Sequence, residues 1–156
     1  TQLRPQGTGQ MSPAHPLFRI CTTLDDLAKA LMVRAIVFME EQQVAYAEEV
    51  DELEHSALHI LGEMAGEPMA AARIRFLGEY AKLERIAVRK AWRGRGLGRE
   101  LVEYMLEVAR ERGFHKFKMH AQAHLVEFYR VHGFEPKGEM FQEAKIDHYL
   151  MVKEEV

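Results

Sequence analysis

Glycine and arginine alternate in one short segment of the chain, Arg93-Gly94-Arg95-Gly96-Leu97-Gly98-Arg99. Closely spaced glycines let the backbone approach a ligand and direct several N–H groups into one concavity. An apolar run, Ile86-Ala87-Val88, precedes the segment, and the amphipathic pattern after it predicts a helix whose first N–H groups are unpaired. Because there are five basic residues and no acid from Arg89 to Arg99, the segment predicts a polyphosphate-binding site. The alternative is a surface turn with a solvated basic face.

The glycine spacing excludes the two common phosphate-binding fingerprints. A P-loop needs a Lys-Ser/Thr pair after its last glycine, and here Gly98 is followed by Arg99-Glu100. The dinucleotide pattern G-x-G-x-x-G is absent because the glycines run G-x-G-x-G. The pattern that fits is R-x-x-G-x-G, formed by Arg93, Gly96 and Gly98, and it resembles the acyl-CoA-binding motif of the GNAT family of N-acetyltransferases.

The resemblance implies how this segment binds a cofactor. In that family the glycine-rich turn binds the pyrophosphate of CoA, and the preceding strand binds the pantetheine arm through its backbone. By position, the residues expected to bind CoA are Ile86, Ala87, Val88, Arg93, Gly94, Arg95, Gly96, Leu97, Gly98 and Arg99. The co-substrate implied is acetyl-CoA, as acyl donor.

A second segment, Ala121 to Phe134, resembles the family pattern N-x-x-A-x-x-F-Y-x-x-x-G-F. Gln122 stands for the usual Asn and Leu125 for the usual Ala, whereas Phe128, Tyr129, Gly133 and Phe134 match. Gln122 is therefore assigned to the cofactor site as well. The chain from Phe18 to Val152 is similar to the ElaA/YjcF-like subgroup, which does not define the acceptor.

The implied reaction moves an acetyl group from acetyl-CoA to a primary amine. Tyr129 occupies the position of the family's general acid, and a phenol with a pKa near 10 can protonate a departing thiolate with a pKa of about 8.5. The alternative is a core tyrosine whose hydroxyl only finds a hydrogen-bond partner.

The amine must lose a proton before it attacks, because a lysine-like ammonium has a pKa of about 10.4. Glu84, two residues before Ile86, is the first candidate base, and the alternative is a strand glutamate paired with Lys82 or Arg85. His120 is a second candidate, although a buried structural histidine fits the same position. A water chain is the third route.

Seven acids and no Lys or Arg lie between Glu40 and Glu54. They predict either a rim that attracts a cationic amine or a solvated acidic face. His55 and His59, and likewise His120 and His124, have a four-residue spacing, but neither pair has a clear third ligand, so no metal is expected.

Composition narrows the class of protein. The net charge of −3 argues against a nucleic-acid-binding protein. The Arg89–Arg99 cluster offers that alternative, but it has no interleaved aromatic residue besides Trp92, so no nucleic-acid partner is expected. No apolar run reaches the length of about eighteen residues that a membrane span needs, so no membrane contact is expected. The single cysteine, Cys21, is typical of a reducing compartment and predicts a cytoplasmic location.

The chain of 156 residues predicts one domain at 17–156 after a flexible N-terminal arm at 1–16. Residues 1–10 are interpreted as sequence added ahead of a natural start at Met11. Apolar alternation and helical periodicity predict the order β-α-(α)-β-β-β-α-β-α-β-β. Strands are predicted at 17–21, 56–64, 69–77, 80–88, 116–121, 134–141 and 147–152, and helices from Thr22 or Thr23 through Phe38, at 98–112 and at 123–132, with a short helix or loop in 40–53.

The expected fold class is α/β (α+β in some schemes), with the GNAT acyl-CoA N-acyltransferase fold. Its mixed, mostly antiparallel sheet of about seven strands is flanked by helices and splays between the fourth and fifth strands. An alternative function is a non-catalytic, acyl-CoA-binding or sensing GNAT-like module. Exposed strand edges predict a homodimer, with Gly133, Phe134 and the last strands as its interface.

Overall fold

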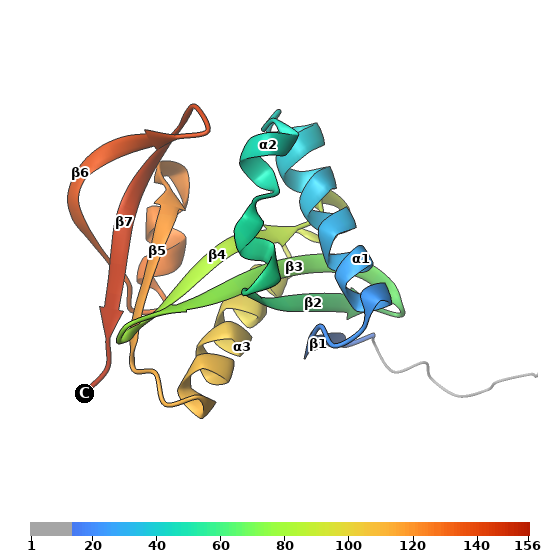
Figure 1. Cartoon of the computed structure of the whole chain (residues 1–156), viewed down its shortest axis with the longest axis horizontal. Helices are drawn as coiled ribbons and strands as arrows, with labels where there is room; N and C mark the ends of the chain where they lie inside the picture. Colours follow the sequence, from blue (N-terminus) through green and yellow to red (C-terminus); the bar gives the residue numbers. More distant parts are fainter. Residues whose placement is uncertain (1–13) are drawn as a thin grey trace, which may run out of the picture.

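The computed structural model describes residues 14–156, which form one seven-stranded sheet with helices on both faces (Figure 1). The strands are β1 (Pro16–Ile20), β2 (Leu58–Met64), β3 (Glu67–Leu77), β4 (Tyr80–Val88), β5 (Lys116–Gln122), β6 (Glu135–Glu143) and β7 (Ile146–Glu154). The α-helices are α1 (Leu24–Arg34), α2 (Tyr46–Glu49), α3 (Leu97–Glu111) and α4 (Val126–Arg130). A π-helix, η1 (Ala35–Glu41), continues α1, and 3₁₀ turns lie at η2 (Glu52–His55), η3 (Lys90–Trp92) and η4 (Ala123–Leu125).

The strand order β1-β2-β3-β4-β5-β7-β6 confirms the predicted mixed sheet. All neighbouring strands are antiparallel except β4 and β5, which are parallel. In the described part of the chain this pair is hydrogen-bonded only from Tyr80–Lys82 to Lys116–Lys118. Beyond Lys82 the two strands separate, so the expected splay is present, and β4 is paired there only with β3.

A β-bulge interrupts β4 at the splay. Ala71 of β3 is opposite Ala87, and Arg73 is opposite Glu84, so two residues of β4 face the single residue between them. Arg85, at the bulge, has a φ of 55°, in the left-handed region. A bulge of this kind turns side chains toward a new direction.

The core lies in two layers, one on each face of the sheet. α1 packs Ala30 and Val33 against Leu61 and Ala71. α3 buries its apolar face on the opposite side, together with the larger cluster that contains Tyr129 of α4. Strand residues alternate between these layers, which is why β2 to β4 are apolar on both faces.

The order of elements agrees with the sequence prediction, and the differences lie at boundaries. Thr23 caps α1 by accepting a hydrogen bond from the backbone N–H of Asp26, one of the two predicted caps. The predicted helix at 123–132 is a 3₁₀ turn followed by the shorter α4. β1 begins at Pro16, inside the predicted arm, and residues 1–13 lie outside the described part.

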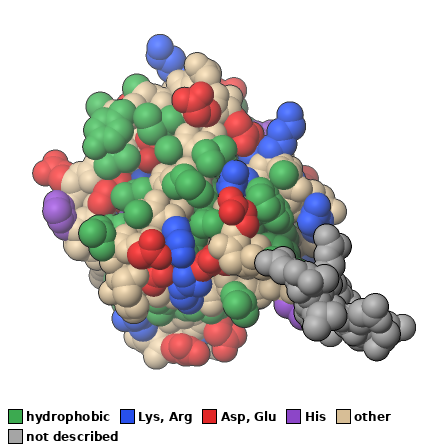
Figure 2. Space-filling view, turned by 90° about the vertical axis from the view of Figure 1, so that its right-hand side faces the viewer, with side chains coloured by type: hydrophobic (Ala, Val, Ile, Leu, Met, Phe, Trp, Pro, Cys, Tyr) green, Lys and Arg blue, Asp and Glu red, His purple; other side chains and the backbone are tan. Residues whose placement is uncertain are grey.

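The surface around α1 and β1 mixes side chains of both charges with scattered hydrophobic ones (Figure 2). No helix within residues 14–156 is long and apolar enough to cross a membrane. Phe134 is fully buried, so it cannot contribute to a dimer interface as predicted. Its ring packs against Tyr129 instead, with the ring centroids 6.3 Å apart.

Candidate functional site

Two cavities open on either side of the point where β4 and β5 separate. The first, called here the loop cavity, has a volume of about 610 Å³ and lies between the end of β4, the glycine-rich loop and α4. The second, called the cleft cavity, has a volume of about 450 Å³ and lies between β4, β5, the segment around α2 and the β6–β7 turn. Four residues line both cavities: Gln42, Ile86, Leu125 and Tyr129.

The loop cavity is built around the start of α3. Gly94 and Gly96 have φ values of 80° and 78°, a conformation that strains any other residue, and Gly96 caps the helix. A Cβ on Gly98 would meet the Phe128 ring at 3.4 Å, so the helix start and α4 approach closely. Nine of the ten residues that the sequence assigns to this loop and its strand line the cavity: Ile86, Ala87, Val88, Arg93, Gly94, Gly96, Leu97, Gly98 and Arg99.

Arg95 is the exception, because its guanidinium does not line either cavity. It donates to the Ala91 carbonyl at 3.3 Å, which holds the side chain back over the loop. The sequence pattern could not distinguish Arg95 from Arg93 and Arg99, because all three are arginines of the same glycine-rich segment.

Arg93 connects the loop to two other elements. Its Nε donates to the Val88 carbonyl at 2.8 Å. Its two terminal nitrogens donate to the Glu41 carboxylate at 2.8 and 2.9 Å, so that the end of η1 is tied to the loop. The guanidinium is about two-fifths exposed and reaches the cavity wall.

Tyr129 is buried between the cavities, with 5% of its surface exposed. Its ring packs edge-on against Phe128, with the ring centroids 5.0 Å apart. Burial raises the pKa of Tyr129 further above its ordinary value of 10, so the side chain is a neutral phenol at neutral pH. This phenol lines both cavities.

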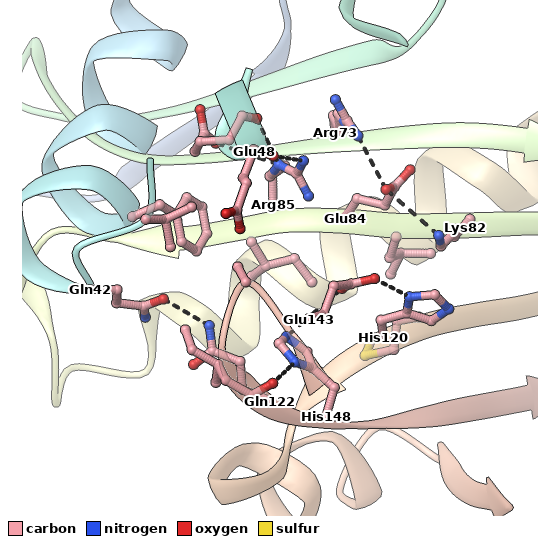
Figure 3. A pocket seen from close by; sticks show the side chains of 18 of the residues that line it. Gln42, Glu48, Arg73, Lys82, Glu84, Arg85, His120, Gln122, Glu143 and His148 are labelled. Atoms are coloured by element: carbon pink, nitrogen blue, oxygen red, sulfur yellow. Dashed lines mark hydrogen bonds and ion pairs between the residues drawn. The ribbon is translucent and has the colours of Figure 1, made fainter. Parts of the chain in front are cut away.

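Glu84 lies in the cleft cavity, where three cations surround it (Figure 3). Arg75 donates to one oxygen, Arg73 donates to the other at 3.2 Å, and Lys82 lies 3.8 Å away. Burial by itself raises the pKa of Glu84, but the Arg75 hydrogen bond and the nearby charges outweigh it and lower the pKa below 4.5. The alternative partners named from the sequence were Lys82 and Arg85, and the two closest ones are Arg73 and Arg75.

A glutamate with two histidines lies across the cleft cavity from Glu84, on β5 and the β6–β7 hairpin. His120 Nδ1 lies 2.9 Å from Glu143 Oε1, and His148 Nε2 lies 3.9 Å from the other oxygen (Figure 3). The pKa of Glu143 is lowered, mainly by the hydrogen bond from His120. With Nδ1 directed at this carboxylate, the Nε2 atom of His120 is left for another partner.

Gln122 lines the cleft cavity and not the loop cavity, which differs from its assignment to the cofactor site. Its amide nitrogen donates to Gln42 Oε1 at 2.9 Å (Figure 3). Gln42 follows the π-helix η1 directly, and a π-helical turn is often found at functional sites. The glutamine at the start of this motif therefore joins the segment after η1 to the end of β5.

The acidic stretch is largely neutralised by buried arginines. Arg34, fully buried, donates to Glu49 at 2.8 Å and to Glu54 at 2.6 Å. Arg73 donates to Asp51 at 2.8 Å and to Glu54 at 2.7 Å. Three of the seven acids are therefore anchors that hold the 42–55 segment on the sheet, which the charge count alone could not reveal.

Several residues of the site carried no signal in the sequence. The loop cavity includes Val37 and His124, and the cleft cavity includes Lys82, Arg75, Glu143 and His148. His124 lies inside the second motif at a position that the family pattern leaves open, and the others lie outside both motifs, on β3, β4 and the β6–β7 hairpin or in η1. Only the register of β4, β5 and β7 brings them together.

Residues 26–155 match the family described as acetyltransferase (GNAT) domain. The chain is 37% identical over 131 residues to YjcF of Bacillus subtilis, described as an uncharacterised N-acetyltransferase, covering 83% of this chain and 94% of YjcF. It is also similar to the crystal structure of Escherichia coli ElaA, with a TM-score of 0.79 and 28% identity over 90% of this chain and 99% of that one.

A third comparison concerns a structure with a bound cofactor. The PaiA N-acetyltransferase of Thermoplasma acidophilum, solved in complex with coenzyme A, has a TM-score of 0.70 and 13% identity over 90% of this chain and 99% of that one. At this identity the likeness shows the shared fold.

Proposed function

Because this chain belongs to the GNAT acetyltransferase family and is an acyl-CoA-dependent N-acyltransferase in its general type, we propose that it transfers the acetyl group of acetyl-CoA to a primary amine. Residues 17–156 form the transferase domain in this proposal. The observation that carries it is the meeting of two cavities at Ile86 and Tyr129, beside the unpaired edge of β4. One cavity suits the donor and the other the acceptor.

The loop cavity would bind the CoA moiety. Backbone N–H groups at Gly94 to Gly98 and the positive end of the α3 dipole face a diphosphate, with Arg93 and Arg99 beside them. The free edge of β4 at Ile86 to Val88 offers backbone groups to the pantetheine arm. This arrangement brings the thioester to the junction with the cleft cavity.

The chemistry then follows from the groups at the junction. The amine nitrogen attacks the thioester carbonyl carbon, a C–N bond forms, and the C–S bond breaks. The ammonium acceptor gives one proton to a base in the cleft cavity before attack and a second to solvent as the amide forms. The CoA thiolate takes a proton from the buried Tyr129 hydroxyl, and the tyrosinate and the base return to their starting states by proton exchange with solvent. The products are an N-acetyl amide and free CoA thiol.

His120 is the base we favour in the cleft cavity. Its Nδ1 contact with Glu143 fixes the orientation of the ring and directs Nε2 away from that carboxylate, as in other acid–histidine pairs. Glu84 remains a second candidate, but its ion pairs with Arg73 and Arg75 stabilise the carboxylate and make it a weaker proton acceptor.

The first experiment is a calorimetric titration with acetyl-CoA, repeated with dephospho-CoA and followed by thiol release with a panel of amines. Gly96→Ala should weaken acetyl-CoA binding by about tenfold or more, since it strains the loop and fills the approach to the diphosphate. Gly66→Ala is the matched control, because Gly66 also has a positive φ but lies in the β2–β3 turn, away from both cavities.

The outcomes separate the hypotheses. Micromolar binding that weakens in Gly96→Ala and not in Gly66→Ala, together with amine-dependent thiol release, supports the transferase. Tight binding without turnover on any amine supports the sensing module instead. The absence of acetyl-CoA binding would contradict both.

A further inference from the structure

The end of the cleft cavity far from Tyr129 has an excess of positive charge. Glu84 is the only carboxylate that Arg75 and Lys82 contact among the described residues, and it also pairs with Arg73. Arg73 is already held by Asp51 and Glu54. Glu84 is therefore the one carboxylate in contact with these two further cations, while the charge of Glu143 acts on Lys82 from beyond ion-pair distance.

Lys82 is the least satisfied of these cations. Its side chain is only 14% exposed, and its nearest carboxylate within residues 14–156 is Glu84 at 3.8 Å, beyond hydrogen-bond distance. Burial, and the like charges of Arg75 and Lys118, lower its pKa. A mostly buried ammonium with no close acceptor gains free energy when an anion binds beside it.

The opposite end of the same cavity is acidic. Glu48 is exposed and lines the cavity near Arg85, and Glu143 lies midway along it (Figure 3). The other acids of the 42–55 segment that line it, Glu49 and Asp51, are bound by arginines, so they offer no broad attraction for a cation. The cavity therefore has cations at its Lys82 end and the exposed carboxylate of Glu48 toward the other, while Gln42, where it joins the loop cavity, is uncharged.

The two ends are well separated. Ile86 is four positions after Lys82 on β4, which corresponds to at most about 13 Å at roughly 3.3 Å per residue, and the lysine side chain covers part of that distance. An amine at the thioester and an anion at Lys82 must therefore be joined by several methylene groups. An α-amino group beside its own carboxylate is too short for this span.

We propose that the acceptor is a small, extended primary amine that carries a carboxylate, with the carboxylate bound by Lys82 and Arg75 and the amine delivered beside Ile86 and Tyr129. This inference rests on the proposed function. The reaction is the acetyl transfer already described, and the carboxylate takes no part in bond making or breaking. Lys82 is a specificity-determining residue.

The test compares amines that differ in one end only. Thiol release is measured at saturating acetyl-CoA with γ-aminobutyrate, ε-aminocaproate, n-hexylamine and hexamethylenediamine. The wild type should favour ε-aminocaproate over n-hexylamine by about tenfold or more in kcat/KM, since a charged hydrogen-bonded contact contributes that much or more. γ-Aminobutyrate should be poorer because it is shorter.

Variants at Lys82 test the residue directly. Lys82→Met should raise the KM for ε-aminocaproate by about tenfold with little change in kcat, and should leave n-hexylamine within about threefold. Lys82→Arg keeps the charge and should retain most of the preference. Lys116→Met is the matched control, since Lys116 lies on the neighbouring strand, pairs with Glu79 and does not line either cavity.

Equal activity on ε-aminocaproate and n-hexylamine would overturn the inference, and so would a Lys82→Met effect of the same size on both. Acetyl-CoA binding without acetylation of either carboxylated amine would overturn it too. Failure of the proposed function itself looks different, because then either acetyl-CoA does not bind in the calorimetric titration or it binds and no amine, n-hexylamine included, releases the thiol. A preference for hexamethylenediamine would replace the carboxylated acceptor with a dicationic one.

Discussion

Tyr129 is the residue on which the transfer reaction depends most directly in this proposal. It lies between the two cavities, its hydroxyl is protonated at neutral pH, and burial raises its pKa because the tyrosinate is poorly solvated there. Tyr129→Phe removes the proton donor and keeps the ring. We expect kcat to fall about 100-fold, within the usual range for a general acid, while the acetyl-CoA Kd stays within about threefold. Steady-state thiol release and calorimetry measure the two quantities, and an unchanged kcat would contradict the assignment.

The base can be identified by a pair of substitutions that separate His120 from Glu84. His120→Asn should lower kcat about 100-fold at unchanged acetyl-CoA affinity, because it removes the proton acceptor next to Glu143. Glu84→Gln should affect kcat less, provided that circular dichroism shows a folded variant, since Arg73 and Arg75 lose an ion pair there. The reverse order of effects would make Glu84 the base.

At this scale the sequence grouped most residues that line the loop cavity, and it missed many of those that line the cleft cavity. Gly96 and Arg93 belong to one contiguous motif, so their positions in the sequence are enough to show that they lie close together in the site. Glu143 and Lys82 have no motif, because they meet only after β7 pairs with β5 and β4 separates from β5. Arg95 and Gln122 were assigned by position in a motif, and their side chains point elsewhere.

Among the elements, the end of β4 and the π-helix η1 determine the geometry of the site. Alternation of apolar residues predicts β4, but no local pattern predicts the bulge at Arg85, since it depends on the register with β3. The side chain of Arg85 donates to the Glu49 carbonyl at 3.1 Å, which explains how the left-handed residue is held. The periodicity from Leu24 to Phe38 predicted a helix and could not distinguish the change to π-helical geometry at Ala35.

The contact between η1 and the loop leads to a prediction about donor affinity. Glu41 holds Arg93 in a two-point ion pair, and its carboxylate repels a diphosphate bound in the loop cavity. Glu41→Gln should therefore tighten acetyl-CoA binding about threefold to tenfold at low salt, with a smaller gain at high salt. Glu40→Gln is the control, because Glu40 is exposed beside it. Weaker binding in Glu41→Gln would show instead that the pair organises the loop.

Across the whole molecule, one ion-pair network joins α1, the η2 turn, β3 and β4. Glu54 is central to it, since it accepts hydrogen bonds from both Arg34 and Arg73. Burial alone would raise the pKa of Glu54, but these two arginines outweigh it and lower the pKa from 4.5 to about 2. The network therefore couples the packing of α1 to the wall of the cleft cavity.

This lowered pKa predicts how stability depends on pH. The contribution of Glu54 is fully present above its unfolded pKa of 4.5 and is lost as the pH falls from there toward about 2. Glu54→Gln should lower the free energy of unfolding at neutral pH by about 3–5 kcal/mol, as for other broken buried pairs, and flatten the acid dependence. Urea unfolding across pH measures both. Glu52→Gln, at an exposed neighbour, should change neither, and an equal acid dependence in Glu54→Gln would refute the role.

The two cavities share four residues and otherwise draw on different parts of the chain. The loop cavity is lined mostly by one continuous stretch of strand, loop and helix, with side chains from η1 and α4 completing it. The cleft cavity combines the 42–51 segment and the central strands with the turn between β6 and β7 at the sheet edge. In descendants of a common ancestor, drift in those two surface segments can change what is acetylated while the donor chemistry is inherited intact. Membership of the family therefore says much about the donor, and the acceptor has to be established for each lineage separately.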